Sequence, residues 1–156
     1  MTLQIIVQWV HVVAGVVWAG AQAFVHLALW PALLRRPAPE SRAFMPALGA
    51  VVAPVMSGSG MVVMVMGIAR GTLLGPIRSW RMLFASPYGW TFIAALVLMG
   101  ALISRGAGAR TRVPPRVWDG DAYRPDAARF LRAEAAVSLT LLAALLATMV
   151  LMRFGL

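Results

Sequence analysis

Both histidines of the chain belong to one row of polar residues in its first apolar segment. When residues 3–29 are wound as an α-helix at about 100° per residue, the polar positions fall within an arc of roughly 80°. They are Gln4, Gln8, His11, Gly15, Trp18, Gln22 and His26. At about 1.5 Å per residue the row is roughly 33 Å long, close to the thickness of the hydrocarbon core of a bilayer. We therefore expect this face to carry the chemistry of the protein.

The spacing of the two histidines limits what they can do together. His11 and His26 are fifteen residues apart, which separates them by roughly 22 Å along a helix. They cannot share one metal ion, and they cannot both bind one haem iron within a single protomer. Ionisable residues inside a membrane are costly and are often functional. We favour a functional role for His11 and a structural hydrogen bond for His26, which lies nearer the interface.

Several methionines are expected at the depth of His11. Met61 and Met64 lie in the outer half of the second apolar segment, and Met149 and Met152 lie in the outer half of the fourth. Imidazole and thioether groups form a soft ligand set that suits Cu(I). We therefore name His11, His26, Met61 and Met64 as candidate metal ligands. The alternative is that the methionines fill an apolar core.

Glu134 is the one carboxylate expected to enter a membrane span. It lies at a level close to His26 and Arg105. A proton relay through Glu134 is one interpretation, and an interfacial glutamate offset by an arginine is the other. Gln4, Gln8 and Gln22 complete the polar face, where glutamines commonly hydrogen-bond neighbouring helices.

The composition predicts an integral membrane protein. Of the 156 residues, 61% are hydrophobic and 12% are charged, and the mean hydropathy is +0.81. We predict one all-α domain, a bundle of four transmembrane helices over residues 3–29, 43–68, 87–104 and 134–152. The first span should end at Trp30-Pro31. Residues 105–124 are polar and rich in proline and glycine, so we expect no regular structure there.

The charged residues indicate topology and exclude several chemistries. All 14 basic residues are arginine and cysteine is absent, which excludes lysine Schiff bases and thiolate metal sites. The loops after the first and third spans hold ten of the arginines, and the opposite side holds four. By the positive-inside rule, both termini face outward across a bacterial-type cytoplasmic membrane. The net charge of +9 is better explained by lipid headgroups than by nucleic acid.

Short motifs in all four spans resemble one family. They are Trp9-Val10-His11 followed by Trp18-Ala19-Gly20, then Pro31-Ala32-Leu33, Ser59-Gly60, Tyr88-Gly89 and Leu131-Arg132-Ala133-Glu134. In this order they resemble the copper-resistance protein D (CopD) family. The opening helix is also similar to that of the HemJ-type protoporphyrinogen oxidases. The matching positions are His11, Trp18, Gly20, Gly60, Gly89 and Glu134.

The resemblance implies a four-helix membrane module tied to copper uptake or to haem-linked redox chemistry. The leading hypothesis is a protein that binds or passes copper, with His11 as a ligand on the outer side. The alternative is a haem b protein for electron transfer or porphyrinogen oxidation, with His11, Trp18 and Gly20 at the cofactor. A third hypothesis is a non-catalytic subunit of a larger membrane complex, or a homo-oligomer.

Overall fold

The computed structural model describes residues 2–155 and confirms the all-α membrane bundle. Four helical segments are long and apolar enough to cross a membrane. The first is continuous from α1 (Thr2–Phe24) through η1 (Val25–Leu29) to α2 (Trp30–Leu33), and the others are α3 (Ala38–Gly71), α5 (Pro87–Arg112) and α7 (Ala127–Arg153). The connections contain α4 (Trp80–Ala85), α6 (Pro114–Val117), and a hairpin of β1 (Trp118–Asp119) and β2 (Ala122–Tyr123).

The first helix does not end at Trp30-Pro31 as predicted, but continues to Leu33 through a π-helical turn. The backbone N–H of Trp30 donates to the carbonyl of Val25, five residues earlier. A proline ring collides with the carbonyl four residues before it in a regular α-helix. The wider turn, which encloses His26, makes room for Pro31 and lets the helix continue.

The other helices begin earlier or end later than the apolar runs predict. The expected spans 43–68, 87–104 and 134–152 lie inside helices that extend beyond them by up to eight residues at one end. Hydropathy detects the stretch that lies in lipid, whereas the helices continue into charged turns. The prediction of no regular structure over residues 105–124 is wrong. This stretch finishes α5 despite Gly106 and Gly108, and then forms α6 and the β-hairpin.

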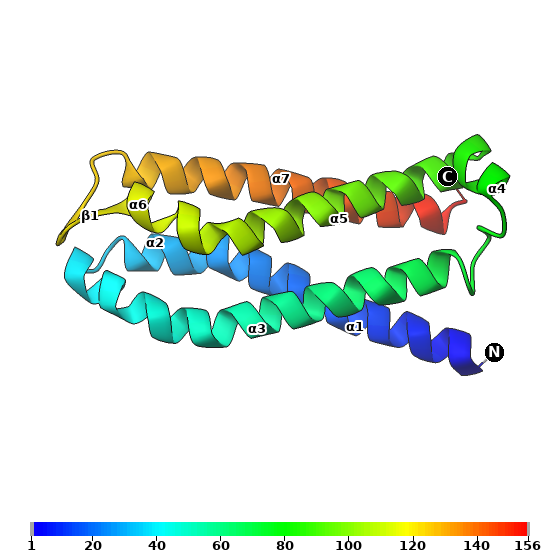
Figure 1. Cartoon of the computed structure of the whole chain (residues 1–156), viewed down its shortest axis with the longest axis horizontal. Coiled ribbons are helices and arrows are strands. Elements are labelled where there is room, and N and C mark those ends of the chain that lie inside the picture. Colours follow the sequence, from blue (N-terminus) through cyan, green and yellow to red (C-terminus); the bar gives the residue numbers. More distant parts are fainter. Residues whose placement is uncertain (1, 156) are drawn as a thin grey trace.

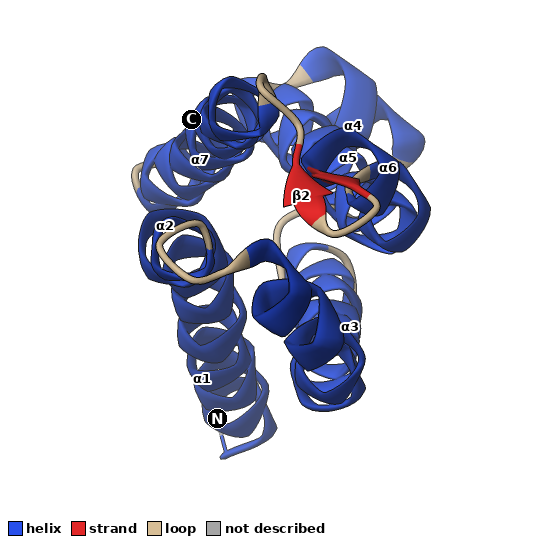
Figure 2. Ribbon diagram, turned by 90° about the vertical axis from the view of Figure 1, so that its left-hand side faces the viewer, coloured by secondary structure: helices blue, strands red, loops and turns tan. Residues whose placement is uncertain are grey.

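The long helices associate as two antiparallel pairs. The first helix packs against α3, and α5 packs against α7, while contacts between the pairs are sparse (Figure 2). Both chain ends and α4 lie at one end of the bundle, which we call the terminal end (Figure 1). The α2–α3 turn, α6 and the β-hairpin lie at the other, the hairpin end. Orientation in the membrane stays a prediction.

Two apolar clusters fill the interior at different levels. One gathers at the hairpin end around Trp30, Val117 and Trp118. The other joins all four long helices and contains Trp18, Val63, Ala95, Met99, Leu102, Leu142 and Leu145. Gly60 permits the second cluster to close, because a Cβ atom at that position would lie 2.8 Å from Nε1 of Trp18. The indole of Trp18 therefore packs directly on the backbone of α3.

Candidate functional site

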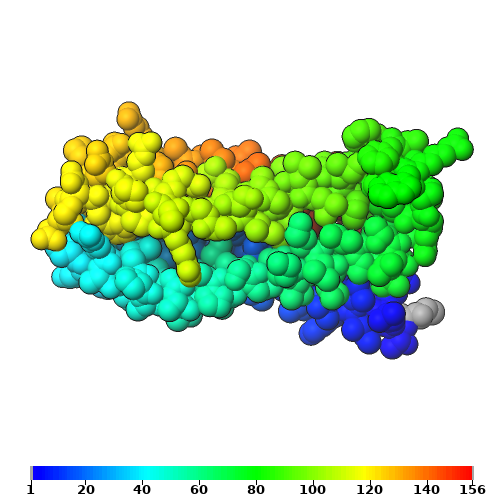
Figure 3. Space-filling model, in the orientation of Figure 1, coloured from blue at the N-terminus to red at the C-terminus, as the bar shows by residue number. Residues whose placement is uncertain are grey.

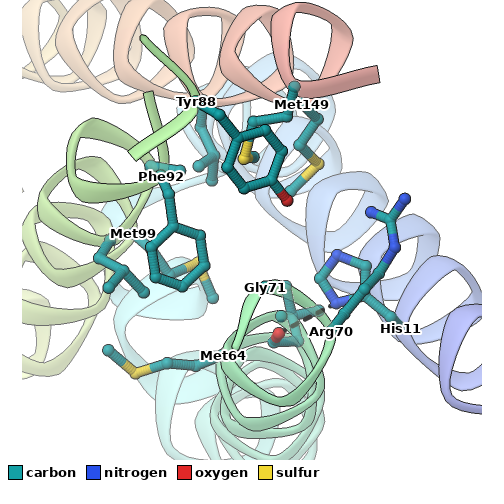
Figure 4. A pocket seen from close by; sticks show the side chains of 14 residues that line it. His11, Met64, Arg70, Gly71, Tyr88, Phe92, Met99 and Met149 are labelled. Atoms are coloured by element: carbon teal, nitrogen blue, oxygen red, sulfur yellow. Dashed lines mark hydrogen bonds between the residues drawn. The ribbon is translucent and has the colours of Figure 1, made fainter. Parts of the chain in front are cut away.

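A cavity near the terminal end is lined by all four long helices. Its volume is about 60 Å³. The lining residues are His11 from α1, Val63, Met64, Gly67, Arg70 and Gly71 from α3, Tyr88, Phe92, Ala95, Leu96 and Met99 from α5, and Leu145, Met149 and Met152 from α7 (Figure 4). It lies between the two helix pairs. In the space-filling view, α1 and α7 are visible through the crevice between α3 and α5 (Figure 3).

The imidazole of His11 is held by α3. Its Nδ1 lies 3.1 Å from the carbonyl oxygen of Val63 (Figure 4). A carbonyl can only accept a hydrogen bond, so Nδ1 carries a proton, and in the neutral imidazole Nε2 then has the free lone pair. The ring packs closely against Gly67, since a Cβ atom there would lie 3.1 Å from Cε1 of His11. Histidines that bind metals commonly donate their other N–H to a carbonyl in this way.

The methionines at the cavity form two groups. Met64 and Met99 lie beside Phe92, on the side of the cavity away from His11 (Figure 4). Met149 lies near Tyr88, on the side toward which Nε2 of His11 points, and Met152 of the same helix also lines the cavity. Met61, a candidate ligand from sequence, is 59% exposed and faces outward from α3. Met64 lines the cavity, but its thioether is directed away from His11.

Two further polar side chains border the cavity near His11. The half-buried Tyr88 points its hydroxyl into the space in front of His11, and Arg70 extends past the imidazole from the last turn of α3 (Figure 4). Arg70 is exposed. The site thus combines an imidazole, a phenol and two thioethers, with a cation at the rim. Sequence reasoning missed Met99 and Arg70, which have no distinguishing pattern, and assigned Tyr88 to the opening motif of the third span.

His26 belongs to a separate cluster near the hairpin end. Glu134 accepts hydrogen bonds from Arg105 at 2.8 Å and Arg112 at 3.2 Å, both to the same carboxylate oxygen. The predicted proximity of Glu134 to Arg105 is therefore present. Nδ1 of His26 is buried without a hydrogen-bond partner among the described residues. Between this cluster and the cavity lies the apolar cluster around Trp18 and Leu102.

The remaining residues of the polar row have packing roles or face outward. Nε2 of Gln4 is 3.5 Å from the carbonyl of Leu74 and the side chain is exposed. Gln8 is partly buried and Gln22 is buried. Gly20 is exposed with open space around it. Neither Trp18 nor Gly20 lines the cavity that contains His11.

A metal site built from hard or charged ligands is absent from the described part of the chain. Across residues 2–155, no three His, Cys, Asp or Glu side chains are grouped so that they could hold an ion. Among the same residues, the side-chain donors that line the cavity are one imidazole, one phenol and four thioethers.

No protein-family model, curated protein or solved structure matches this chain. The resemblance to the CopD family stays a prediction.

Proposed function

We propose that the protein binds Cu(I) in the cavity at the terminal end, through Nε2 of His11 and the thioethers of Met149 and Met152. The supporting observation is the hydrogen bond from Nδ1 of His11 to the carbonyl of Val63, because in the neutral imidazole it leaves the lone pair of Nε2 available at the cavity. Cu(I) favours imidazole and thioether ligands, and it does not require carboxylates.

The dimensions of the cavity support an ion over a large cofactor. One water occupies about 10–15 Å³ of such volume, so about 60 Å³ has room for an ion with a few waters. A haem macrocycle would require the helices to separate. Haem b therefore has no supporting observation here, and the subunit hypothesis has none among the described residues.

Charge at the rim favours a monovalent ion. The Arg70 guanidinium lies beside His11, and its repulsion grows with the charge of the bound ion. Because Arg70 is exposed, solvent and headgroups reduce this repulsion for Cu(I). A divalent ion would have a larger cost and no carboxylate to offset it.

The apolar cluster below the cavity supports binding rather than free passage. Trp18, Leu102 and Leu142 close the bundle between the cavity and the cluster at Glu134. The side chains of Trp18, Leu102 and Leu142 offer no ligand to an ion, and the cost of moving a charge past such apolar groups is high. The ion would then enter and leave the cavity at the terminal end.

The test is Cu(I) affinity of the purified protein in detergent, measured by competition with a chromophoric Cu(I) chelator. His11→Asn retains an N–H donor for Val63 and removes the Nε2 ligand, so affinity should fall by at least about tenfold, a loss of about 1.4 kcal/mol. Met149→Leu should weaken binding less. His26→Asn and Met61→Leu are the matched controls and should bind as the wild type does. Unchanged affinity in folded His11→Asn protein would refute the proposal.

A further inference from the structure

A second cavity lies at the hairpin end, outside the proposed copper site. Its volume is about 220 Å³, and it is lined by Leu29, Ala32, Leu33, Arg36 and Phe44. These residues come from the end of the first helix, the turn after it and the start of α3. The cavity is thus open where the first membrane span gives way to the loop.

The walls of this cavity offer almost no polar groups. The carbonyl of Leu33 is already bonded by Ser41 Oγ at 2.8 Å and by the Tyr123 hydroxyl at 2.7 Å. The carbonyl of Arg36 lies 3.2 Å from the same hydroxyl. Water in an apolar space of this size would lack hydrogen-bond partners. In a bilayer, a lipid acyl chain is the apolar group available to occupy this cavity.

Among the described residues, Arg36 is the one charged residue that lines this cavity. Arg36 is exposed, and the four ion pairs among residues 2–155 involve Arg105, Arg112 and Arg124 instead. Arg35 is adjacent but does not line the cavity. An arginine free of acidic partners binds phosphate well, because its planar guanidinium offers several donors in a fixed geometry.

We propose that this cavity binds one anionic phospholipid, with an acyl chain against Leu29, Ala32 and Phe44 and the phosphate at Arg36. The depth is consistent with this arrangement, because Arg36 follows the last helical residue, Leu33, by three positions. The chain would thus lie in the hydrocarbon region while the headgroup lies at the interface. The bound lipid would cover apolar surface that the protein itself leaves open.

The test is native mass spectrometry of delipidated protein with equal amounts of phosphatidylglycerol and phosphatidylcholine that share the same acyl chains. The wild type should retain phosphatidylglycerol about fivefold more, the preference expected of one arginine at an anionic headgroup. Arg36→Gln should lose that preference. Arg35→Gln, the neighbouring arginine outside the cavity, should keep it.

Two further arms test the acyl chain. Ala32→Phe, or Ala32→Leu if the larger side chain prevents folding, should reduce retention of both lipids by filling the cavity. Excess inorganic phosphate should not displace the lipid. Equal retention of the two lipids by the wild type, equal losses in the two arginine variants, or full retention by the folded Ala32 variant would each overturn the proposal. Displacement by phosphate would also overturn it, since the site would then bind a free anion.

Discussion

The two ends of the bundle are held together by different interactions. At the hairpin end, polar contacts join the two helix pairs: Tyr123 reaches Leu33 and Ser41, Arg42 donates to the carbonyl of Gly120 at 2.9 Å, and Arg110 donates to that of Gly49 at 3.3 Å. At the terminal end, the hydrogen bonds of His11 and Gln4 stay within the first pair and its following loop.

The difference is consistent with the position of the cavity that lies between the two pairs, which is at the terminal end. Lipid provides no hydrophobic drive for helices to associate, so close packing and interhelical hydrogen bonds hold a membrane bundle together. At the hairpin end, both close packing and hydrogen bonds hold the two helix pairs together. The terminal end depends on apolar contacts between the pairs, which leave room for a ligand. Substitutions at the two ends should therefore affect different properties.

The largest effect is expected for Glu134→Gln at the hairpin end. The change leaves Arg105 and Arg112 without their carboxylate partner. Loss of one member of a fully buried ion pair costs about 3–5 kcal/mol. Because the three side chains are 18–39% exposed, we expect about 1–3 kcal/mol in the free energy of unfolding. Unfolding in a detergent–SDS titration measures it.

Glu40→Gln is the control for this variant, since Glu40 is an exposed acid outside the ion pairs described. It should unfold as the wild type does. Equal stability of the Glu134 and Glu40 variants would contradict a stabilising role for the arginine cluster. Copper affinity should be unchanged in both.

An intermediate effect is expected for Tyr123→Phe. The phenol contacts the Leu33 carbonyl and Ser41 Oγ, each at 2.7 Å. Its loss should cost about 1 kcal/mol, the usual net contribution of one hydrogen bond. The same SDS titration reports it, and hydrogen exchange should increase in the β-hairpin. A variant with wild-type stability and exchange would show that this phenol does not hold the helix pairs together.

The smallest effect, and the one that separates the two ends, is expected for Gly67→Ala. The added Cβ would lie 3.1 Å from Cε1 of His11, so the ring must shift by a few tenths of an ångström. We expect Cu(I) affinity to fall by about threefold, below 1 kcal/mol. Helix propensity favours alanine by about 0.5–1 kcal/mol, so stability should not fall.

Gly49→Ala is the matched control in the same helix, because a Cβ there meets nothing within 4 Å. It should gain the helix propensity of alanine and keep the affinity of the wild type. Equal copper affinities in the two glycine variants would show that the contact between Gly67 and His11 does not affect copper binding.

The sequence predicts the architecture well because long apolar runs have few alternative structures in a membrane. It predicts the helix ends less well. Arg105 and Arg112 appear as loop residues by charge, yet both are helical and both bind the carboxylate of Glu134 across the interhelical contact. The π-turn around His26 likewise depends on Pro31, whose effect on the preceding carbonyls is not visible in a hydropathy pattern.

The candidate site is harder to predict because it depends on which helices become neighbours. A helical wheel places His11 on an inward face, and the structure confirms that it is partly buried. It cannot place Met149 at the same cavity as His11, since the two are far apart in the chain. It also cannot separate Met64, which lines the cavity, from the exposed Met61. Both distinctions come from the packing of α3 against its neighbours.

The arrangement in two helix pairs has a consequence for biosynthesis. The first pair is complete once residue 71 has been synthesised, and its internal contacts need nothing from the rest of the chain. Tyr123, Gly120 and Arg110 emerge later, and each reaches back to an earlier residue of the first pair. Each pair can therefore enter the bilayer as a hairpin, and the contacts at the hairpin end form last. Until they form, the Arg42 guanidinium and the Gly49 carbonyl lack the partners that the second pair provides.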